Sequence, residues 1–487
     1  MQPPDRAAQA QAGGTQPIGS RLETGRDYSV RSAIVAPTAA AATAHPLATQ
    51  IALDVMKDGG SALDAAIAAN AFLGLAEPTN GSIGGDLFAL VWDPVSEELV
   101  GYNGSGRSPR GASLADMQQT ADTYSDGSIL PAYGEMTVSV PGAVDAWFAL
   151  HARFGRLPMS RLLAPSIAYA ETGAPILETV AYEWKQQENW LSDAAGRGEI
   201  SAFDTARNLF FSPSPVEGDL FESPDLARTY RLLATHGRAA FYTGEIARAI
   251  DAHMQRSGGA LRYADFAIHQ GEWVAPICAD YRQARLCEIG PNTQGIAALH
   301  MLELMETFDI SEMGFASADA IMLGVEAKRL AFADRARLYA DPNFSNMDAS
   351  DLIAPDYVSA RRSQIDLATA MPTPGPGLRA ADATLSRGDT TYITVADGTG
   401  MMVSLIQSNY YGMGSGVVAP GTGFMLQNRG RLFSLDPEHP NRFEPGKRPF
   451  QTIIPAFAFH RDAQGAWQPW LSYGVMGGDM QPQGHVQ

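Results

Sequence analysis

The feature that most constrains this chain is an abrupt change of sequence pattern at residue 390. Residues 371–388 (MPTPGPGLRAADATLSRG) are rich in Pro, Gly, Ala and Ser and have no hydrophobic period, which predicts an exposed linker. Residues 390–396 (TTYITVA) then favour a strand, 397–400 (DGTG) favour a Gly-containing loop, and 401–408 favour a second strand. The junction therefore predicts a loose connection that runs directly into a β-hairpin.

The spacing of this hairpin brings two hydroxyl groups close together. With a four-residue loop, Ala396 pairs with Met401, and Thr390 then lies opposite Gln407 and beside Ser408. A functional pair of hydroxyls and two ordinary exposed strand ends would both give this spacing. The pattern alone leaves the two interpretations open.

Composition excludes several classes of partner. The 487 residues carry a formal charge of −18. A protein face that binds nucleic acid or an anionic membrane instead carries clustered Lys and Arg. No stretch reaches the roughly 18 apolar residues of a membrane span, and residues 1–30 lack the apolar core of a signal peptide. We expect a flexible tail at 1–30, no nucleic-acid or membrane partner, and cytoplasmic residence.

The chain has only two cysteines, Cys278 and Cys287, and they flank a predicted turn at 280–283. A disulfide is geometrically feasible across such a turn, but a reducing cytoplasm favours free buried thiols. No Cys/His cluster has the spacing of a zinc site, so we expect no metal.

Hydrophobic spacing predicts a helix-rich region before the linker, with one short strand at 87–92. The predicted helices are 46–57, 62–75, 143–153, 159–171, 225–236, 245–256, 296–308 and 317–339.

Several sequence blocks resemble the γ-glutamyltransferase family of N-terminal-nucleophile hydrolases, from about Ser32 to the end of the chain. The block at the predicted junction is Asp389-Thr390-Thr391-Tyr392. The other blocks are 56–66 (MKDGGSALDAA), 77–78 (EP), 83–85 (IGG), 140–142 (VPG), 241–244 (FYTG), 280–282 (DYR) and 333–335 (ADR).

This resemblance implies an α/β (α+β) fold, a four-layer αββα sandwich of the N-terminal-nucleophile hydrolase type. It implies self-cleavage between Asp389 and Thr390 into a large chain, 31–389 after the tail, and a small chain, 390–487. Thr390 would be the nucleophile and Ser408 its supporting hydroxyl. Gly477 and Gly478 match the pair that forms the oxyanion hole, and no cofactor is needed.

The residues that would bind substrate differ from the family pattern. Arg107 lies two places from the expected Arg, and the Asn expected after the second hydroxyl falls on Tyr410, with Asn409 one place earlier. The acidic pair is replaced by Arg431-Leu432 and the serine pair by Gln451-Thr452. An α-ammonium group would find no acidic partner there and would be repelled by Arg431.

Three hypotheses follow. The chain is a γ-glutamyl hydrolase or transferase of the glutathione type with a remodelled pocket; or an acylase or oxamate-type amidohydrolase with a non-glutamyl donor; or an uncut, catalytically silent fragment or assembly subunit. The third is considered because family members continue beyond the motif at 477–478, so the small chain looks truncated. The expected partners are a small amide substrate, water or an amine acceptor, and the two chains of one precursor, and a homodimer of such heterodimers is compatible with them.

Overall fold

The computed structural model describes residues 34–345, 348–376 and 389–487. The tail predicted at 1–30 and residues 377–388 of the predicted linker lie outside this part. The described chain from Ala39 onward forms one compact unit.

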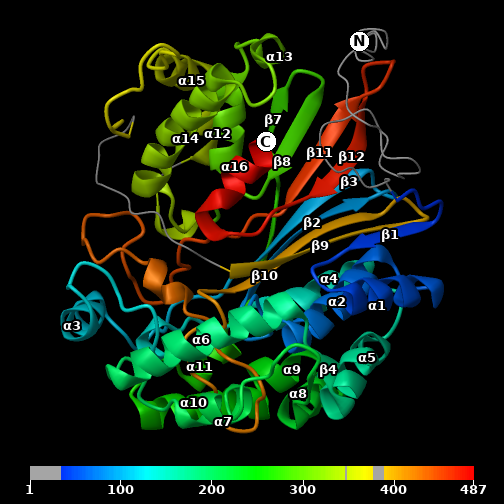
Figure 1. Ribbon diagram of the computed structural model, residues 1–487, viewed down its shortest axis with the longest axis vertical. Coiled ribbons are helices and arrows are strands. Elements are labelled where there is room, and N and C mark those ends of the chain that lie inside the picture. Colours follow the sequence, from blue (N-terminus) through cyan, green and yellow to red (C-terminus); the bar gives the residue numbers. More distant parts are fainter. Residues whose placement is uncertain (1–33, 346–347, 377–388) are drawn as a thin grey trace, which may run out of the picture. The chain divides into compact units, whose positions relative to one another are not determined.

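Two antiparallel sheets form the centre of this unit (Figure 1). The first has the strand order β1-β9-β10-β2-β3-β6 and the second β12-β11-β8-β7. The strands of the first sheet are β1 (Ala39–Ala42), β9 (Asp389–Asp397), β10 (Met402–Tyr410), β2 (Asp86–Asp93), β3 (Glu98–Gly104) and β6 (Glu272–Val274). Those of the second are β12 (Trp467–Tyr473), β11 (Ala456–Arg461), β8 (Ala284–Glu288) and β7 (Ile277–Tyr281), and a separate pair joins β4 (Ala174–Pro175) to β5 (Leu220–Phe221).

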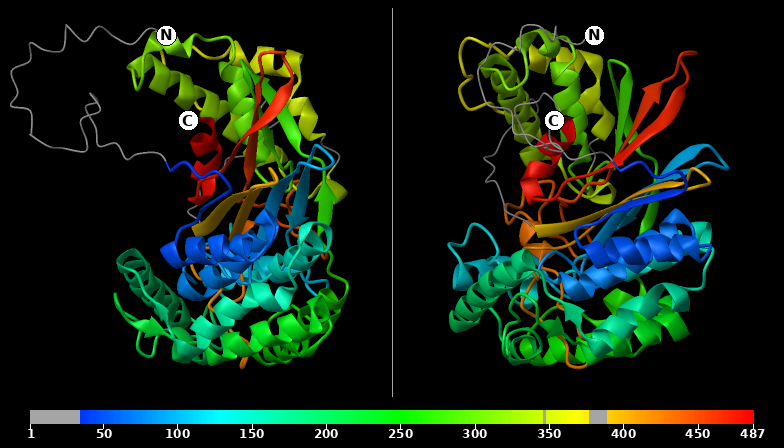
Figure 2. Two further views of the ribbon diagram at one scale, coloured as in Figure 1. Left: turned by 90° about the vertical axis from the view of Figure 1, so that its right-hand side faces the viewer. Right: turned by 45° about the vertical axis from the view of Figure 1, so that its right-hand side comes forward.

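Helices cover the outer face of each sheet, which gives the predicted four-layer αββα arrangement (Figure 2). Below the first sheet lie α1 (Pro46–Lys57), α2 (Ala62–Ala76), α4 (Ala143–Phe154), α5 (Met159–Thr172), α8 (Pro224–His236), α9 (Arg238–Tyr242), α10 (Glu245–Ser257) and α11 (Tyr263–Ala267). Beside them lie α3 (Leu114–Tyr124), α6 (Glu178–Gly196) and α7 (Asp204–Phe210). The second sheet is covered by α12 (Gly295–Met305), α13 (Ile310–Met313), α14 (Ala318–Leu338), α15 (Pro355–Arg362) and α16 (Gln481–Val486).

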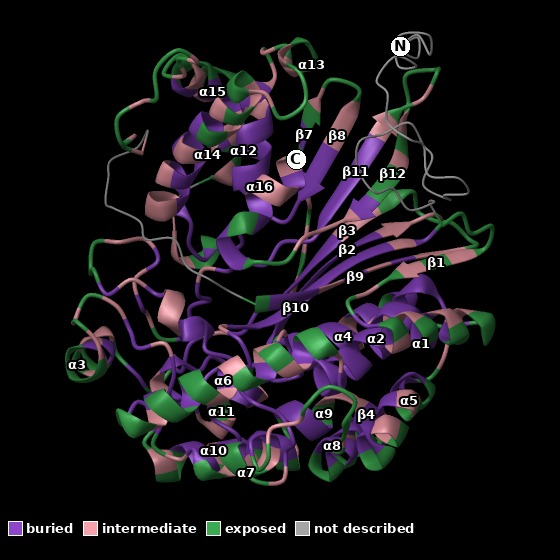
Figure 3. Cartoon of the chain, viewed as in Figure 1, coloured by how far each residue is buried: buried purple, intermediate pink, exposed green. Residues whose placement is uncertain are grey.

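Helix α2 shows why the first sheet is placed where it is. Its sequence is apolar on every side, and all of its residues are buried. Ser61 and Asp64 form a reciprocal capping box that fixes its first turn. A helix of this kind requires cover on all sides, which the first sheet and α1, α4 and α5 provide (Figure 3).

The hairpin β9–β10 forms as predicted, but its register is shifted by one residue. Ala396 pairs with Met402 rather than Met401, because the backbone N–H of Asp397 donates to the carbonyl of Met401 and closes a longer loop. Thr391, not Thr390, therefore lies opposite Gln407. An irregularity between Gln407 and Tyr410 then places two residues of β10 against one of β9, as in a β-bulge.

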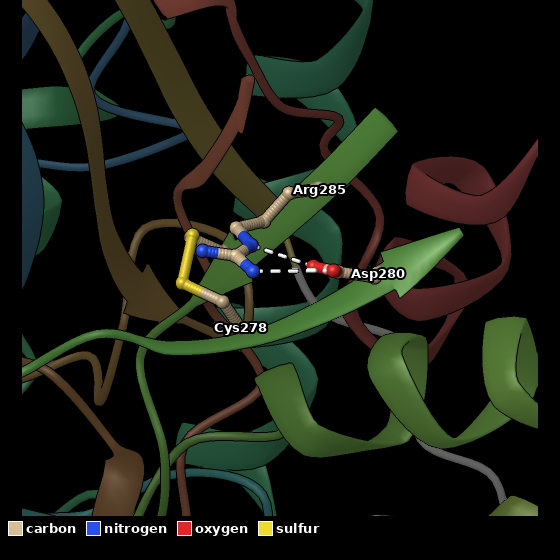
Figure 4. The surroundings of a disulfide bond; sticks show 4 residues. Cys278, Asp280 and Arg285 are labelled. Carbon is tan, nitrogen blue, oxygen red and sulfur yellow. Dashed lines mark hydrogen bonds and ion pairs between the residues drawn. A yellow bond between two sulfur atoms is a disulfide. The ribbon is translucent and has the colours of Figure 1, made fainter. Parts of the chain in front are cut away.

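The expectation of free thiols was wrong. Cys278 on β7 and Cys287 on β8 are directly paired in the hairpin register, and a disulfide joins them. An ion pair between Arg285 and Asp280 lies beside it (Figure 4). Disulfides are more typical of oxidising compartments than of the cytoplasm. The predicted cytoplasmic residence is not tested by the fold and stays a prediction.

None of the helices in the described part of the chain is long and apolar enough to span a membrane.

Candidate active site

The register decides which face of the sheet Thr390 occupies. Residues two apart in a strand share a face, so Thr390 shares the face of Tyr392, which packs in the core between the two sheets. Thr391 takes the opposite face with Gln407, whose side-chain oxygen accepts a hydrogen bond from Asn70 of α2. A one-residue shift exchanges the faces, and Thr390 consequently lies between the sheets.

Ser408 contacts the peptide bond that precedes Thr390. Its Oγ donates to the carbonyl oxygen of Asp389 at 2.6 Å and accepts from the backbone N–H of Tyr410 at 2.7 Å. Thr390 is 1% exposed, and its Oγ1 has no hydrogen-bond partner among the described residues. The sequence prediction that these two hydroxyls lie close together is consistent with this arrangement, with the bulge bringing Ser408 opposite Thr390.

Tyr410 has a strained backbone at the end of the bulge. Its φ is +85°, in the left-handed region that bulky residues avoid. A carboxyl group at the junction also has a perturbed pKa. Desolvation of the carboxyl group, reinforced by the charge of Glu183, raises the pKa of Asp389 to about 6 although much of that residue is exposed. Strained backbone angles and perturbed pKa values are both concentrated at functional sites.

A buried carboxylate, Asp86, accepts hydrogen bonds from several segments around the site. It begins β2 and pairs with Ser408 of β10. Its Oδ1 accepts from the backbone N–H groups of Gly106 and Gly142 at 2.9 and 3.2 Å. The side-chain amides of Gln427 and Gln451 add bonds of 2.9 and 2.7 Å. Burial raises the pKa of Asp86, and these donors together with the charge of Arg429 oppose that rise.

The second buried ion of the site is Arg429, in a short 3₁₀ helix at Arg429–Leu432. Its Nη1 donates to Thr452 Oγ1 at 2.8 Å, and its guanidinium lies 4.7 Å from the centre of the Tyr410 ring. Burial lowers the pKa of Arg429 to about 10, and Asp86 opposes the shift. The sequence analysis did not single out Asp86 or Arg429, although Asp86 directly follows the matched block at 83–85 and Arg429 lies two residues before Arg431.

The predicted glycine pair is connected to Thr452, the residue that Arg429 contacts. Gly477 and Gly478 have φ values of +114° and +57°, which residues with a Cβ rarely adopt. The side-chain amide of Gln294 donates to the carbonyl oxygens of both Gly478 and Thr452. Gln294 thus connects the glycine turn to Thr452, which in turn contacts Arg429, and Arg429 packs on Tyr410.

Three predicted substrate-binding residues are occupied by other contacts. Arg107 pairs with Glu272 at 2.9 Å and Asp341 at 3.3 Å. The Asn409 amide bonds Ser82 and the carbonyl of Met413. Arg431 donates to the carbonyl of Leu130. Gln451, Thr452 and Tyr410, by contrast, belong to the cluster around Asp86 and Arg429.

The described residues contain no group of three His, Cys, Asp or Glu side chains arranged to hold a metal.

Comparison with known proteins decides the family. The model of the gamma-glutamyltranspeptidase family matches residues 48–487. The chain belongs to this family. It is 35% identical to the glutathione hydrolase-like YwrD proenzyme of Bacillus subtilis (strain 168), over 90% of this chain and 78% of that protein. The family is one of hydrolases and transpeptidases.

Other relatives differ in their named activities. The chain is 33% identical to the oxamate amidohydrolase proenzyme of Klebsiella pneumoniae, over 90% of this chain and 79% of that protein. The crystal structure of a cephalosporin acylase from Bacillus halodurans matches with a TM-score of 0.86 and 40% identity, over 95% of this chain and 82% of that one. This gamma-glutamyltranspeptidase family member therefore has glutathione hydrolase-like, amidohydrolase and acylase relatives.

The acidic groups beside the junction predict a pH-dependent stability. Burial and the nearby charge of Glu183 raise the pKa of Glu77 from 4.5 to about 7, a change that corresponds to about 3 kcal/mol. The folded protein holds this proton more tightly than the unfolded chain, so stability falls as pH rises from about 4.5 to about 7. We expect the advantage of Glu77→Gln over the parent in unfolding free energy to grow by up to about 3 kcal/mol between pH 4 and pH 8.

Denaturant unfolding at both pH values measures this difference. The matched control is Glu178→Gln, which removes an exposed carboxylate from α6, the helix that also carries Glu183. An advantage that is constant with pH, or equal in the control, would show that Glu77 is not held protonated by its surroundings.

Proposed function

We propose that the chain is a precursor that cleaves its own Asp389–Thr390 bond and then uses Thr390 as the nucleophile of an amidohydrolase or acyltransferase. The observation that carries this proposal is the 2.6 Å hydrogen bond from Ser408 Oγ to the carbonyl oxygen of Asp389. That oxygen belongs to the bond that must break, and a donor aimed at it stabilises the negative charge that develops during attack.

The self-cleavage step can be written from these residues. Thr390 Oγ attacks the carbonyl carbon of Asp389, and its proton passes to the departing nitrogen as the C–N bond breaks. The result is an ester between Asp389 and Thr390 Oγ together with a free α-amine on Thr390. Water hydrolyses the ester and leaves a new carboxylate on Asp389 and a new N-terminal threonine.

The mature reaction uses the same hydroxyl. The α-amine of Thr390, with an unperturbed pKa of about 7.7–8.0, accepts the proton of Oγ. The acyl group of the substrate moves to Oγ and the amine leaves, after which water gives hydrolysis and an amine gives transfer. The backbone N–H groups at Gly477 and Gly478 are the proposed oxyanion donors of this step.

Two donor classes fit this chemistry. Similarity to the glutathione hydrolase-like protein favours a γ-glutamyl donor. Similarity to the oxamate amidohydrolase and to the cephalosporin acylase favours a non-glutamyl donor, as does Arg431-Leu432 at the place of the acidic pair. The alternative of an uncut, silent subunit predicts a single chain on a denaturing gel.

The role of Ser408 gives a direct test. In Ser408→Ala the carbonyl of Asp389 loses its side-chain donor, and loss of one such donor typically slows a reaction by about 10²–10³-fold. We therefore expect self-cleavage to slow by about 10²-fold or more. A time course on denaturing gels, started from freshly purified precursor, measures the rate.

Ser404→Ala is the matched control, because Ser404 is another buried hydroxyl of β10 that bonds Tyr392 and the carbonyl of Tyr473. It should cleave at close to the parental rate. Equal rates for Ser408→Ala and the parent would mean that the hydrogen bond to Asp389 does not assist cleavage.

A further inference from the structure

Arg429 is a fully buried cation whose hydrogen-bonding capacity is only partly used. It is 0% exposed, and one nitrogen, Nη1, donates to Thr452 Oγ1. Its Nε and Nη2 have no hydrogen-bond partner among the described residues. Buried N–H groups without partners are costly, and for a charged group the cost is larger. A side chain kept in this state is suited to receive a ligand.

The charge of Arg429 is also incompletely balanced. No carboxylate of the described residues lies within 4.0 Å of its guanidinium. Asp86 supplies the attraction that acts on it from further away. Asp86 Oδ1 accepts from Gly106, Gly142 and Gln427, and Oδ2 accepts from Gln451. Neither oxygen accepts a hydrogen bond from Nε or Nη2 of Arg429.

Contacts on two sides connect Arg429 to the reacting groups. On one side its guanidinium packs on Tyr410, whose N–H donates to Ser408 Oγ. On the other side Thr452 is tied through Gln294 to Gly478, one of the proposed oxyanion donors. Arg429 is therefore part of the same cluster as the nucleophile and the oxyanion turn.

We propose that Arg429 binds a carboxylate at the far end of the acyl group, so that the preferred donors are monoamides of dicarboxylic acids that carry no ammonium group. A guanidinium presents a planar pair of N–H groups that matches a carboxylate in a bidentate contact. This inference rests on the proposed use of Thr390 as the nucleophile, and it assigns the specificity of that site to Arg429 rather than to Arg431 or Arg107.

The absence of an ammonium group follows from the charges in the cluster. An ammonium beside Arg429 would be repelled by the guanidinium, and the charge of Asp86 already acts on Arg429. Among the other acidic groups around the junction, the charge of Glu183 raises the pKa of Glu77 and that of Asp389. Glu183 is already bonded to Thr79 and Asn80.

Matched chromogenic substrates test the proposal. Glutaryl mono-p-nitroanilide and pentanoyl p-nitroanilide have the same chain length and differ only in the terminal carboxylate, while γ-glutamyl p-nitroanilide adds an ammonium. For the self-processed parent we expect the glutaryl compound to have the highest kcat/KM. In Arg429→Gln its kcat/KM should fall by roughly 10²–10³-fold, and that of the pentanoyl compound should change by less than about threefold, as expected when one partner of a buried charge pair is removed. Arg431→Gln removes a neighbouring guanidinium and should keep the preference for the carboxylate.

The possible results distinguish a failure of this inference from a failure of the proposed function, in which Thr390 is the nucleophile. An equal loss on glutaryl and pentanoyl compounds in Arg429→Gln would show that Arg429 only supports the fold, and loss of the preference in Arg431→Gln would assign the contact to Arg431. Equal or faster release from the γ-glutamyl compound by the parent would overturn the exclusion of an ammonium group. If the parent processes but turns over no anilide, its Tm with added ligand gives the test. The Tm of the parent should rise with glutarate and not with pentanoate, and the Tm of Arg429→Gln should not rise with glutarate. A parent that stays in one piece and releases nothing contradicts the proposed function itself.

Discussion

Thr390→Ala is expected to remain a single 487-residue chain and to release no acyl product. The substitution removes the Oγ that attacks the carbonyl of Asp389, and the same oxygen would carry the acyl group in the mature enzyme. Removing the nucleophile of a covalent mechanism lowers turnover by at least about 10⁴-fold. Denaturing gels report cleavage, and release of p-nitroaniline from the substrates above reports turnover.

The neighbouring threonine is the control. Thr391 is equally buried and its hydroxyl also has no hydrogen-bond partner among the described residues, but it lies on the face of β9 that packs against the helices. Thr391→Ala should cleave and turn over substrate, with some loss of stability. If Thr391→Ala instead stayed uncut while Thr390→Ala was processed, the register and the choice of nucleophile would both be wrong.

Asp86→Ala is expected to give the largest loss of stability among the site variants. The substitution removes the carboxylate whose charge acts on buried Arg429 and takes the acceptor from four donors. Although the two side chains are not in direct contact, we expect the loss of this charge and of four buried hydrogen bonds to cost about as much as breaking a buried ion pair, about 3–5 kcal/mol. Denaturant unfolding in the uncleaved Thr390→Ala background measures the cost within one chain, and weak self-cleavage of Asp86→Ala alone should accompany it.

Asp86→Asn separates the charge from the hydrogen bonds. Gln451 has an unpartnered Oε1, so rotation of its amide lets it accept from the new Asn side chain. This variant should lose less than the alanine variant, about 1–3 kcal/mol, because only the charge facing Arg429 is removed. Equal losses in the two variants would mean that the charge of Asp86, and not its hydrogen bonds, holds the site together.

The layers and most helices could be predicted because their hydrophobic spacing is local. Helix α1 begins and ends at the predicted residues, and the predicted strand at 87–92 lies within β2. Helix α6 was not predicted, although its buried residues Val180, Trp184, Gln187, Leu191 and Ala194 have helical spacing. A glutamine among them, and the polar residues between them, obscure the apolar period.

The details of the site depend on contacts that the sequence does not reveal. The register was misplaced by one residue because a backbone hydrogen bond, from Asp397 to Met401, sets the length of the hairpin loop. Arg429 and Arg431 are two residues apart and have the same charge, yet tertiary packing buries the first and directs the second to the carbonyl of Leu130. The cysteine pairing likewise followed from strand geometry, whereas compartment arguments favoured free thiols.

The central claim is that this chain cuts itself before Thr390, and N-terminal sequencing of the purified protein tests it most directly. We predict two N-termini, one from the beginning of the large chain and one that reads Thr-Thr-Tyr-Ile-Thr from residue 390. A protein that yields only Met1 or a trimmed residue of the tail, or a second N-terminus at any other position, would contradict the account.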